Sequence, residues 1–181
     1  MSTLTTTVTG KSTNFNIDLP TLDSVRSPLA SPSMRGAVVG LTLETELAAL
    51  YLATVQSLCY GTRHIIDTIT EVGHSVNSLT VCGGITNSSL FLQTQADVLN
   101  MNILVPREKE SVLLGAAMLG MSAAGQSGDL HQVVTNINIK ADVVEPRSSK
   151  VSFHEAKYKV FREMVRDQLK YRDIMEKYDK S

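Results

Sequence analysis

The chain has 181 residues, of which 43% are hydrophobic and 19% charged, and its formal net charge is -1. This composition is sufficient to build a core and excludes general disorder. No run of Lys or Arg is concentrated enough to indicate nucleic-acid or anionic-membrane binding. Tryptophan is absent and aromatic residues make up 5%, which argues against a surface that stacks bases.

Two cysteines, Cys59 and Cys82, stand in apolar stretches. We expect two buried, reduced thiols rather than a disulfide, which is typical of a cytoplasmic protein. No Cys/His spacing matches a zinc site, and no apolar run approaches the roughly 18 residues of a membrane span. A basic region followed by an apolar run, which would indicate a secretory signal, is also missing from the first residues.

The first part of the chain is expected to be irregular. Residues 1–18 are rich in Ser and Thr, and we expect a poorly ordered lead-in. A folded domain is then predicted over residues 19–126. It opens on a loop, because Pro20, Pro28 and Pro32 each disfavour helix at the residue before them.

A strand and a long helix follow the loop. Residues 37–43 predict a short strand, and residues 44–72 predict a helix whose apolar side chains recur at helical spacing. Thr45 is the expected N-cap of this helix. Gly73 is placed to end the helix, because a glycine just past the last turn adopts the left-handed conformation easily.

The most informative stretch is residues 78–97, which predict a buried strand, a double-glycine turn and an amphipathic helix. Gly83 and Gly84 lack Cβ atoms where the chain must turn or let a ligand approach. Asn87 and Ser88 are good N-caps, so free N–H groups at the helix start would point at the turn, as suits a nucleotide. A βα turn that binds nothing explains the same pattern, and spacing alone does not choose between them.

Three more elements are predicted in the second half of this domain: a helix over residues 88–100, a strand over 101–106 and a helix over 111–124. A glycine inside a helix costs up to about 1 kcal/mol relative to alanine, so two of them need a reason. Close helix–sheet packing is the simpler reason, and close approach of a ligand is the other. The last helix has a face of small residues: Gly115, Ala116, Ala117, Gly120, Ala123 and Ala124.

The remaining residues predict a connector and a final helix. Residues 127–150 are mostly polar, with a strand-like patch at 133–139. Residues 151–181 contain an amphipathic helix over 153–178, which we expect to pack on the domain. Alternating strands and helices predict an α/β fold with parallel pairing. Because the expected strands are few, we expect the chain to be the C-terminal portion of something larger.

Several motifs stand in a fixed order and spacing along the chain: Gly83-Gly84, Gln93, Ala96-Asp97, Pro106, Glu110 and Gly115-Ala116-Ala117. With these motifs, the chain resembles the second domain of the FGGY carbohydrate kinases over about residues 26–178. Residues 36–42 followed by 53–56 are similar to the family's second signature, and residues 146–175 are similar to the tail of its pentulose-kinase branch.

The resemblance implies a fold, a reaction and its cofactors. The fold is a partial actin-like (ribonuclease H-like) ATPase domain with a C-terminal amphipathic helix. The reaction is phosphorylation of a pentulose such as D-ribulose with ATP and Mg²⁺. Gly83 and Gly84 are assigned to close approach of the adenosine part of the nucleotide. Ser88 stands where the family usually has Asn, and Asn87 lies one position earlier.

The resemblance also implies a loop on the substrate side, and there the sequence departs from the family pattern. Residues 23–25 read Asp-Ser-Val, where related kinases usually carry His-Gly-Asn. Ala49 stands where the second signature usually has a polar residue. The loop residues that match are Arg26, Ser27, Arg35 and Gly36.

No catalytic residue is carried over onto this chain. In the family the phosphate-binding hairpin, the catalytic Asp and the sugar contacts lie upstream. We therefore expect the isolated chain to be inactive and the missing N-terminal domain to be its partner. Asp23, Asp67 and Asp97 are candidate carboxylates by type only, and a structural role is favoured for Asp97. His64 and His74 have no apparent nucleophile or metal partner and are expected on a helix surface or at a helix end.

Two other functions are compatible with parts of the sequence. A non-catalytic module derived from the kinase would bind a nucleotide or a partner through the sheet edge and helix faces left uncovered. A dinucleotide-binding oxidoreductase is disfavoured, because the Gly-x-Gly-x-x-Gly pattern is missing after the strand, as is an acidic residue about 20 positions on.

Overall fold

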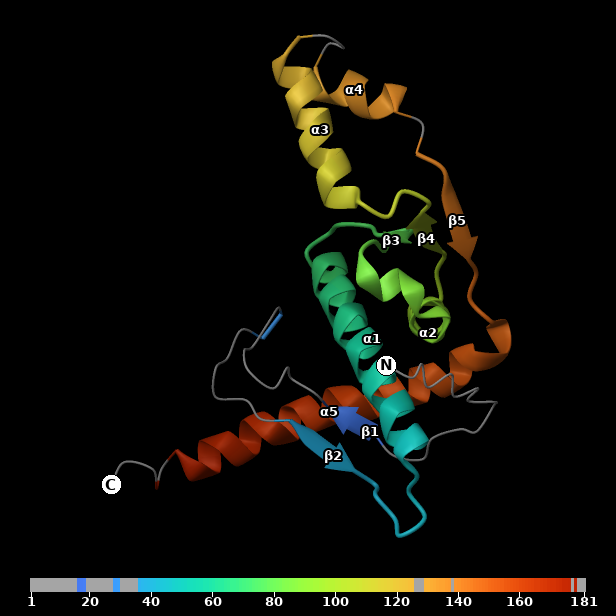
Figure 1. Cartoon of the computed structure of the whole chain (residues 1–181). Coiled ribbons are helices and arrows are strands. Elements are labelled where there is room, and N and C mark those ends of the chain that lie inside the picture. Colours follow the sequence, from blue (N-terminus) through green and yellow to red (C-terminus); the bar gives the residue numbers. More distant parts are fainter. Residues whose placement is uncertain are drawn as a thin grey trace.

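The computed structural model describes residues 16–18, 28–29, 36–125, 129–137, 139–176 and 178. Two helices, α3 (Ser111–Ala123) and α4 (Leu130–Asn136), form an arm that stands away from the rest (Figure 1). Among the described helices, none combines the length and the apolar character needed to cross a membrane. Three helices form the body together with a small sheet: α1 (Leu47–Glu71), α2 (Ser89–Leu99) and α5 (Val151–Met175).

The sheet of the body has three described strands in the order β3 (Leu79–Thr80), β4 (Ile103–Pro106) and β5 (Ala141–Val144). β3 and β4 are parallel, as the sequence predicts for a βαβ unit. β5 pairs antiparallel with β4 and lies inside the predicted connector, where no strand is expected at these residues. Helix α2 covers one face of this sheet through Leu92 and Ala96, which pack around Ile103.

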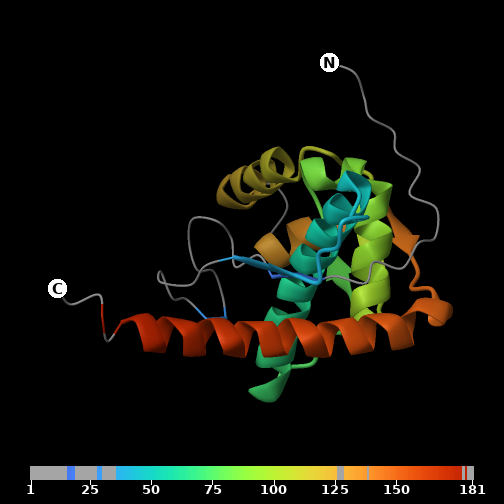
Figure 2. The ribbon, with the colours of Figure 1, turned by 90° about the horizontal axis from the view of Figure 1, so that it is seen from below.

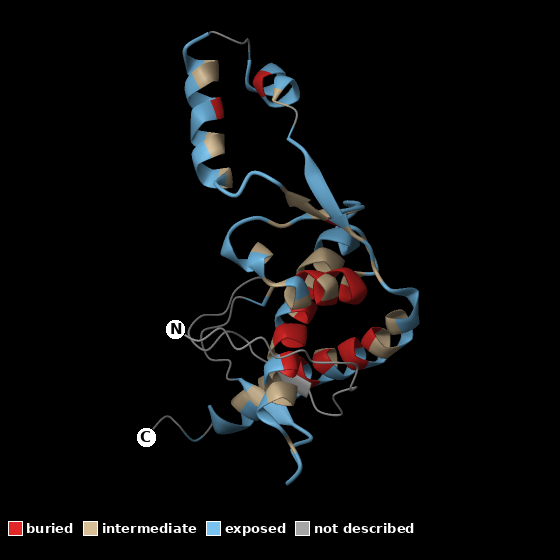
Figure 3. Cartoon of the chain, turned by 45° about the vertical axis from the view of Figure 1, so that its right-hand side comes forward, coloured by how far each residue is buried: buried red, intermediate tan, exposed pale blue. Residues whose placement is uncertain are grey.

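The core lies where α5 crosses α1 and α2. Figure 3 shows the buried residues gathered on these three helices, and Figure 2 shows α5 running straight past the end of this contact. The apolar periodicity of residues 153–178 predicts such a packed helix, and the structure has it at Val151–Met175. The main cluster draws residues from all three helices: Val55, Cys59, Tyr60, Val98, Tyr158, Phe161 and Val165.

A second, two-stranded sheet lies outside the βαβ unit. β1 (Asn16–Asp18) pairs antiparallel with β2 (Ala37–Val39). The strand expected at residues 37–43 therefore exists in its first part, but among the described residues it pairs with β1 and not with the sheet of the body. β1 falls inside the predicted lead-in, and its backbone runs beside α1 and α5.

The start of α1 differs from the prediction, whereas its end agrees. Glu46, not Thr45, is the N-cap residue, and its side chain accepts no capping bond. The Thr45 hydroxyl oxygen instead accepts a bond of 2.9 Å from the Thr42 N–H, which closes a turn before the helix. Gly73 follows the C-cap residue with a φ of 96°, the left-handed conformation expected of a helix-ending glycine.

The strand predicted at residues 133–139 is wrong, because α4 occupies Leu130–Asn136. A capping box starts this helix. The Asp129 carboxylate accepts from the Gln132 N–H at 2.9 Å, and the Gln132 side chain accepts from the Asp129 N–H at 3.1 Å. These reciprocal bonds satisfy two N–H groups at the start of the helix. The sequence prediction follows the apolar residues alone and therefore misses this cap.

Polar pairs cross the α1–α5 contact beside the apolar cluster. The Tyr60 hydroxyl lies 2.9 Å from His154 Nδ1, and the Tyr158 hydroxyl donates to Asp67 Oδ2 at 2.6 Å. Lys157 Nζ donates to Gln56 Oε1 at 2.6 Å, and burial lowers the pKa of Lys157 to about 8. Buried polar groups that find partners favour one arrangement of the two helices over others.

Burial lowers the pKa of His154 to about 4. The Asp97 carboxylate opposes this shift, and the nearby cations, Lys157 foremost, add to it. A histidine in the unfolded chain has a pKa of about 6.5. Between these two values the unfolded chain binds a proton that the folded chain does not, so stability falls as the pH falls through this window.

We predict that lowering the pH from 7 to 5 removes about 2 kcal/mol more stability from the natural chain than from His154→Gln. The glutamine variant keeps a polar side chain beside Tyr60 but has no group that titrates. Urea unfolding at a series of pH values measures the difference. Parallel stability curves for the two proteins would contradict a buried neutral His154.

Candidate functional site

The double-glycine turn joins the end of β3 to α2. Gly83 has φ 84° and ψ -169°, a conformation that residues with a Cβ rarely adopt. A short 3-10 helix, η1 (Gly84–Asn87), follows and leads directly to Ser88, the N-cap of α2. The predicted order of strand, turn and helix N-terminus is therefore confirmed, with one 3-10 turn inserted before the helix.

The turn is open on its outer side. A Cβ placed on Gly83 or Gly84 would meet no atom within 4 Å, and both residues are exposed. The turn is held from within, because the Thr86 hydroxyl donates to the Gly83 carbonyl oxygen at 2.7 Å. A ligand could thus approach the backbone of both glycines without displacing any side chain of the described residues.

Polar groups at the start of α2 divide into used and available ones. The Ser88 hydroxyl oxygen accepts from the Phe91 N–H at 3.2 Å, so it caps the helix. Asn87 is exposed, and its side chain makes no hydrogen bond to another described residue. The N–H groups of the first helical residues have no acceptor within the helix and carry its positive end. The arrangement can therefore bind a polar or anionic ligand.

Two other residues of the matched motif do not face the turn. The Asp97 carboxylate is fully buried and accepts from both the backbone N–H of Arg147, at 2.8 Å, and its guanidinium, at 3.0 Å through Nε. Gln93 donates to Asp97 Oδ1 and to the Glu145 carbonyl oxygen. These bonds clamp α2 to the segment that leads into α5, so the structural role expected for Asp97 is what the structure has.

Sequence reasoning did not find Arg147 as the partner of Asp97. The two residues are 50 positions apart, and Arg147 stands in a polar connector with no periodicity of its own. Only Pro146, which favours an extended backbone before it, marks that place in the sequence.

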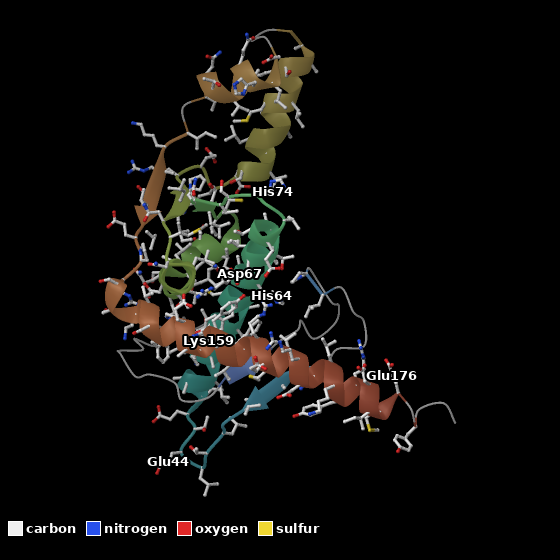
Figure 4. All side chains as sticks on the ribbon, turned by 180° about the vertical axis from the view of Figure 1, so that it is seen from behind. Glu44, His64, Asp67, His74, Lys159 and Glu176 are labelled. Atoms are coloured by element: carbon white, nitrogen blue, oxygen red, sulfur yellow. The ribbon has the colours of Figure 1, made fainter. Side chains whose placement is uncertain are left out.

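The other candidate residues lie away from the turn. Figure 4 labels His64 and Asp67 on α1 near α5 and His74 beyond the end of α1. Asp67 accepts from Tyr158, and burial lowers the pKa of His64. Of the substrate-side loop, Gly36 is exposed before β2. Arg26, Ser27 and Arg35, like Asp23, lie outside the described residues.

The cysteines differ from each other. Cys59 is buried in the core, and burial raises the pKa of its thiol. Cys82 is exposed beside the turn, so the expectation that both thiols are buried is wrong for Cys82. The two-residue strand β3 ends before Cys82, so this residue stands in the turn and not in the sheet.

The part of the chain that the structure describes does not by itself fit a metal ion. No three His, Cys, Asp or Glu side chains gather in it. Asp67 and Asp97, the carboxylates singled out from the sequence, are both engaged by Tyr158 and Arg147.

Comparison with known proteins decides which family this turn belongs to. The sequence profile of the C-terminal domain of the FGGY family of carbohydrate kinases matches residues 7–124. The chain belongs to the FGGY family of carbohydrate kinases. The match includes β3, the double-glycine turn, α2, β4 and α3, and it ends before α4.

Curated relatives of this chain are also described as carbohydrate kinases or as proteins with an FGGY carbohydrate kinase domain. An FGGY carbohydrate kinase domain-containing protein of Danio rerio is 38% identical over 97% of this chain and 33% of its own length. The protein of the same description from Homo sapiens is 40% identical over 86% of this chain and 29% of its own length. A ribulokinase of Shouchella clausii is 32% identical over 75% of this chain and 25% of its own length. The chain thus spans a third or less of the length of these two FGGY carbohydrate kinase domain-containing proteins.

Solved structures agree with this assignment. A xylulose kinase from Brucella ovis superposes with a TM-score of 0.75 and 25% identity, over 83% of this chain and 31% of that chain. Plasmodium falciparum glycerol kinase with ADP superposes with a TM-score of 0.71 and 22% identity, over 87% of this chain and 31% of that chain. The fold is therefore the α/β, actin-like fold of the FGGY sugar kinases, and helix α5 follows at its C-terminal end.

We predict that Arg147→Ala lowers the free energy of unfolding by about 3 kcal/mol, because it leaves the buried Asp97 carboxylate without its cation. The matched control is Arg107→Ala. Arg107 also forms an ion pair, with Asp142 at 2.7 Å, but both of these side chains are exposed. Loss of the Arg107 side chain should therefore cost less than about 1 kcal/mol. Equal effects of the two substitutions in urea unfolding would contradict the clamp.

Proposed function

We propose that this chain is the nucleotide-binding C-terminal part of an ATP-dependent carbohydrate kinase. The observation that carries the proposal is the open double-glycine turn at the positive end of α2, within a chain of the FGGY family. Gly83 and Gly84 would let the adenosine part of ATP or ADP approach the backbone. Asn87 would supply a side-chain amide, and Ser88 would hold the helix start in place.

The proposed reaction is transfer of the γ-phosphoryl group of ATP to a sugar hydroxyl. Catalysis of this kind is mainly positioning and stabilisation of charge, with a carboxylate that takes the hydroxyl proton. Asp67 and Asp97, the described carboxylates singled out from the sequence, are held by structural partners, so we assign positioning and not proton transfer to them. The proton acceptor and the sugar contacts, together with any Mg²⁺ ligands, would come from the part of the kinase that the relatives have and this chain does not span.

A pentulose such as D-ribulose is the proposed sugar. Its support is the similarity to a ribulokinase over 75% of this chain, including part of the region after residue 124. The superposition with a xylulose kinase also favours a five-carbon keto sugar, whereas the glycerol kinase marks how far the substrate varies on this fold.

A cytoplasmic location is also part of the proposal. Two free thiols, Cys59 and Cys82, support it.

The second candidate is a non-catalytic module that binds a nucleotide or a partner. One observation favours it: the Ser88 hydroxyl oxygen is used as a helix cap, so the polar contact available at the turn is Asn87. Nucleotide binding without transfer, or partner binding without nucleotide, would distinguish this candidate from the kinase.

We predict that the purified chain binds ADP and ATP weakly, because the phosphate contacts of a complete kinase site are missing, and that Gly84→Val removes binding. The valine side chain would fill the space through which the ligand reaches the backbone. Isothermal titration calorimetry measures the loss, which should be at least tenfold in affinity.

Gly61→Val is the matched control for this substitution. Gly61 lies in α1, and a Cβ there also meets no atom within 4 Å, so the two variants share their chemistry but not their place. Binding should persist in Gly61→Val. If the folded natural chain binds neither ADP nor ATP, the turn does not act alone and the proposal fails for this chain.

A further inference from the structure

Arg63 joins the three core helices through polar contacts. It stands on α1, and its Nη1 donates to the Val98 carbonyl oxygen of α2 at 3.2 Å. Its Nη2 pairs with Glu155 of α5 at 2.7 Å. The guanidinium carbon lies 4.3 Å from the centre of the Tyr158 ring, also on α5. The Arg63 side chain is only 18% exposed, so these contacts are made largely out of water.

The contact with α2 lies at the end of the helix opposite the double-glycine turn. α2 ends at Leu99, so Val98 is among its last residues. The last four carbonyl groups of a helix have no N–H partner within it and carry its negative end. Arg63 offers such a carbonyl both a donor and a positive charge. Its effect on the turn must therefore act through the helix and not by contact with a ligand.

Two polar contacts at this end fix the direction in which α2 points. Arg147 holds Asp97 from the segment before α5, and Arg63 holds the next residue from α1. The apolar contacts of α2 have no preferred direction, whereas hydrogen bonds depend on distance and angle. The helix has 11 residues and is about 16 Å long, so a change of tilt at the end that Arg63 holds moves the turn at the other end.

The neighbours of Arg63 hold its own side chain in place. The Tyr158 ring supports the guanidinium, and the hydroxyl of that ring donates to Asp67 Oδ2 at 2.6 Å. Asp67 lies one helical turn beyond Arg63 on α1. Arg162 Nη1 donates to the same hydroxyl at 3.3 Å. The carboxylate that the sequence offers as a candidate acid is thus part of the support around Arg63.

We propose that Arg63 is a positioning residue for the nucleotide turn: it sets the tilt of α2, and through it the place of the backbone that an adenosine nucleotide approaches. The ligand named here rests on the proposed function. Lysine is not an equivalent side chain, because the planar guanidinium reaches Val98 and Glu155 from two nitrogens at once and lies over an aromatic ring.

The first test uses the chain without nucleotide. Arg63→Met keeps an unbranched apolar side chain over Tyr158 and removes the donors. Tyr158→Phe is the matched control, because it removes the α1–α5 hydrogen bond to Asp67 and leaves the contact with Val98 intact. Amide exchange is followed by NMR at three residues whose N–H groups donate around the turn: Thr86, Ser88 and Leu92.

We expect these three amides to exchange about tenfold faster in Arg63→Met, since loss of a hydrogen bond to a charged group changes an equilibrium by about that factor. Exchange at the same amides should be unchanged in Tyr158→Phe. Equal rates in the two variants, or natural rates in Arg63→Met, would overturn the proposal. If Arg63→Met does not fold, Arg63→Lys takes its place in the same comparison.

The second test measures ADP affinity by calorimetry at a temperature at which every variant is fully folded. The dissociation constant should rise about tenfold in Arg63→Met, stay unchanged in Tyr158→Phe and lie between the two in Arg63→Lys. A loss of affinity that is the same in Arg63→Met and Tyr158→Phe would assign Arg63 a general structural role and contradict the proposal. If the natural chain does not bind ADP, the proposed function fails, and the exchange comparison still decides whether Arg63 positions the turn.

Discussion

The packing of α5 across α1 is the contact on which the rest of the described structure depends. The sheet is too small to organise a core, since β3 has two residues and β4 and β5 have four each. Instead, α5 brings Tyr158, Phe161 and Val165 against α1, and α2 joins the same cluster through Val98. Burying large aromatic and aliphatic side chains stabilises by roughly 2 kcal/mol each, which makes this cluster the main apolar contribution.

The candidate site inherits its geometry from that packing. α2 packs into the core through Leu90, Phe91 and Val98, and Arg147, which stands just before α5, holds it at Asp97. With these contacts along its length, the helix presents its N-terminus and the double-glycine turn in one position. The turn itself makes few contacts, so it can accept a ligand without disturbing the core. Among the residues that the family motif shares, Gln93 and Asp97 support the helix, and we propose that Gly83 and Gly84 let a ligand approach.

Local signals predict the βαβ unit, the turn and the long helices, because helical periodicity, Gly73 and the Ser88 cap act within a few residues. Contacts between distant segments escape the same reasoning. The pair of Asp97 and Arg147 and the pairing of β1 with β2 depend on where the chain returns, and the helix at 130–136 depends on a reciprocal side-chain cap. Position 88 illustrates the limit for the site. The sequence predicts that Ser88 is either a helix cap or a ligand contact, and only the structure shows that its hydroxyl oxygen accepts from the Phe91 N–H.

Amide hydrogen exchange with and without ADP tests most directly whether a helical core presents a nucleotide turn. The account predicts the slowest exchange in α1, α2 and α5 together, and a further slowing at residues 83–91 when ADP is added. Exchange in the α3–α4 arm should not respond to ADP. Unchanged exchange at residues 83–91, in a chain whose three core helices are protected and ADP is in excess, would contradict the account.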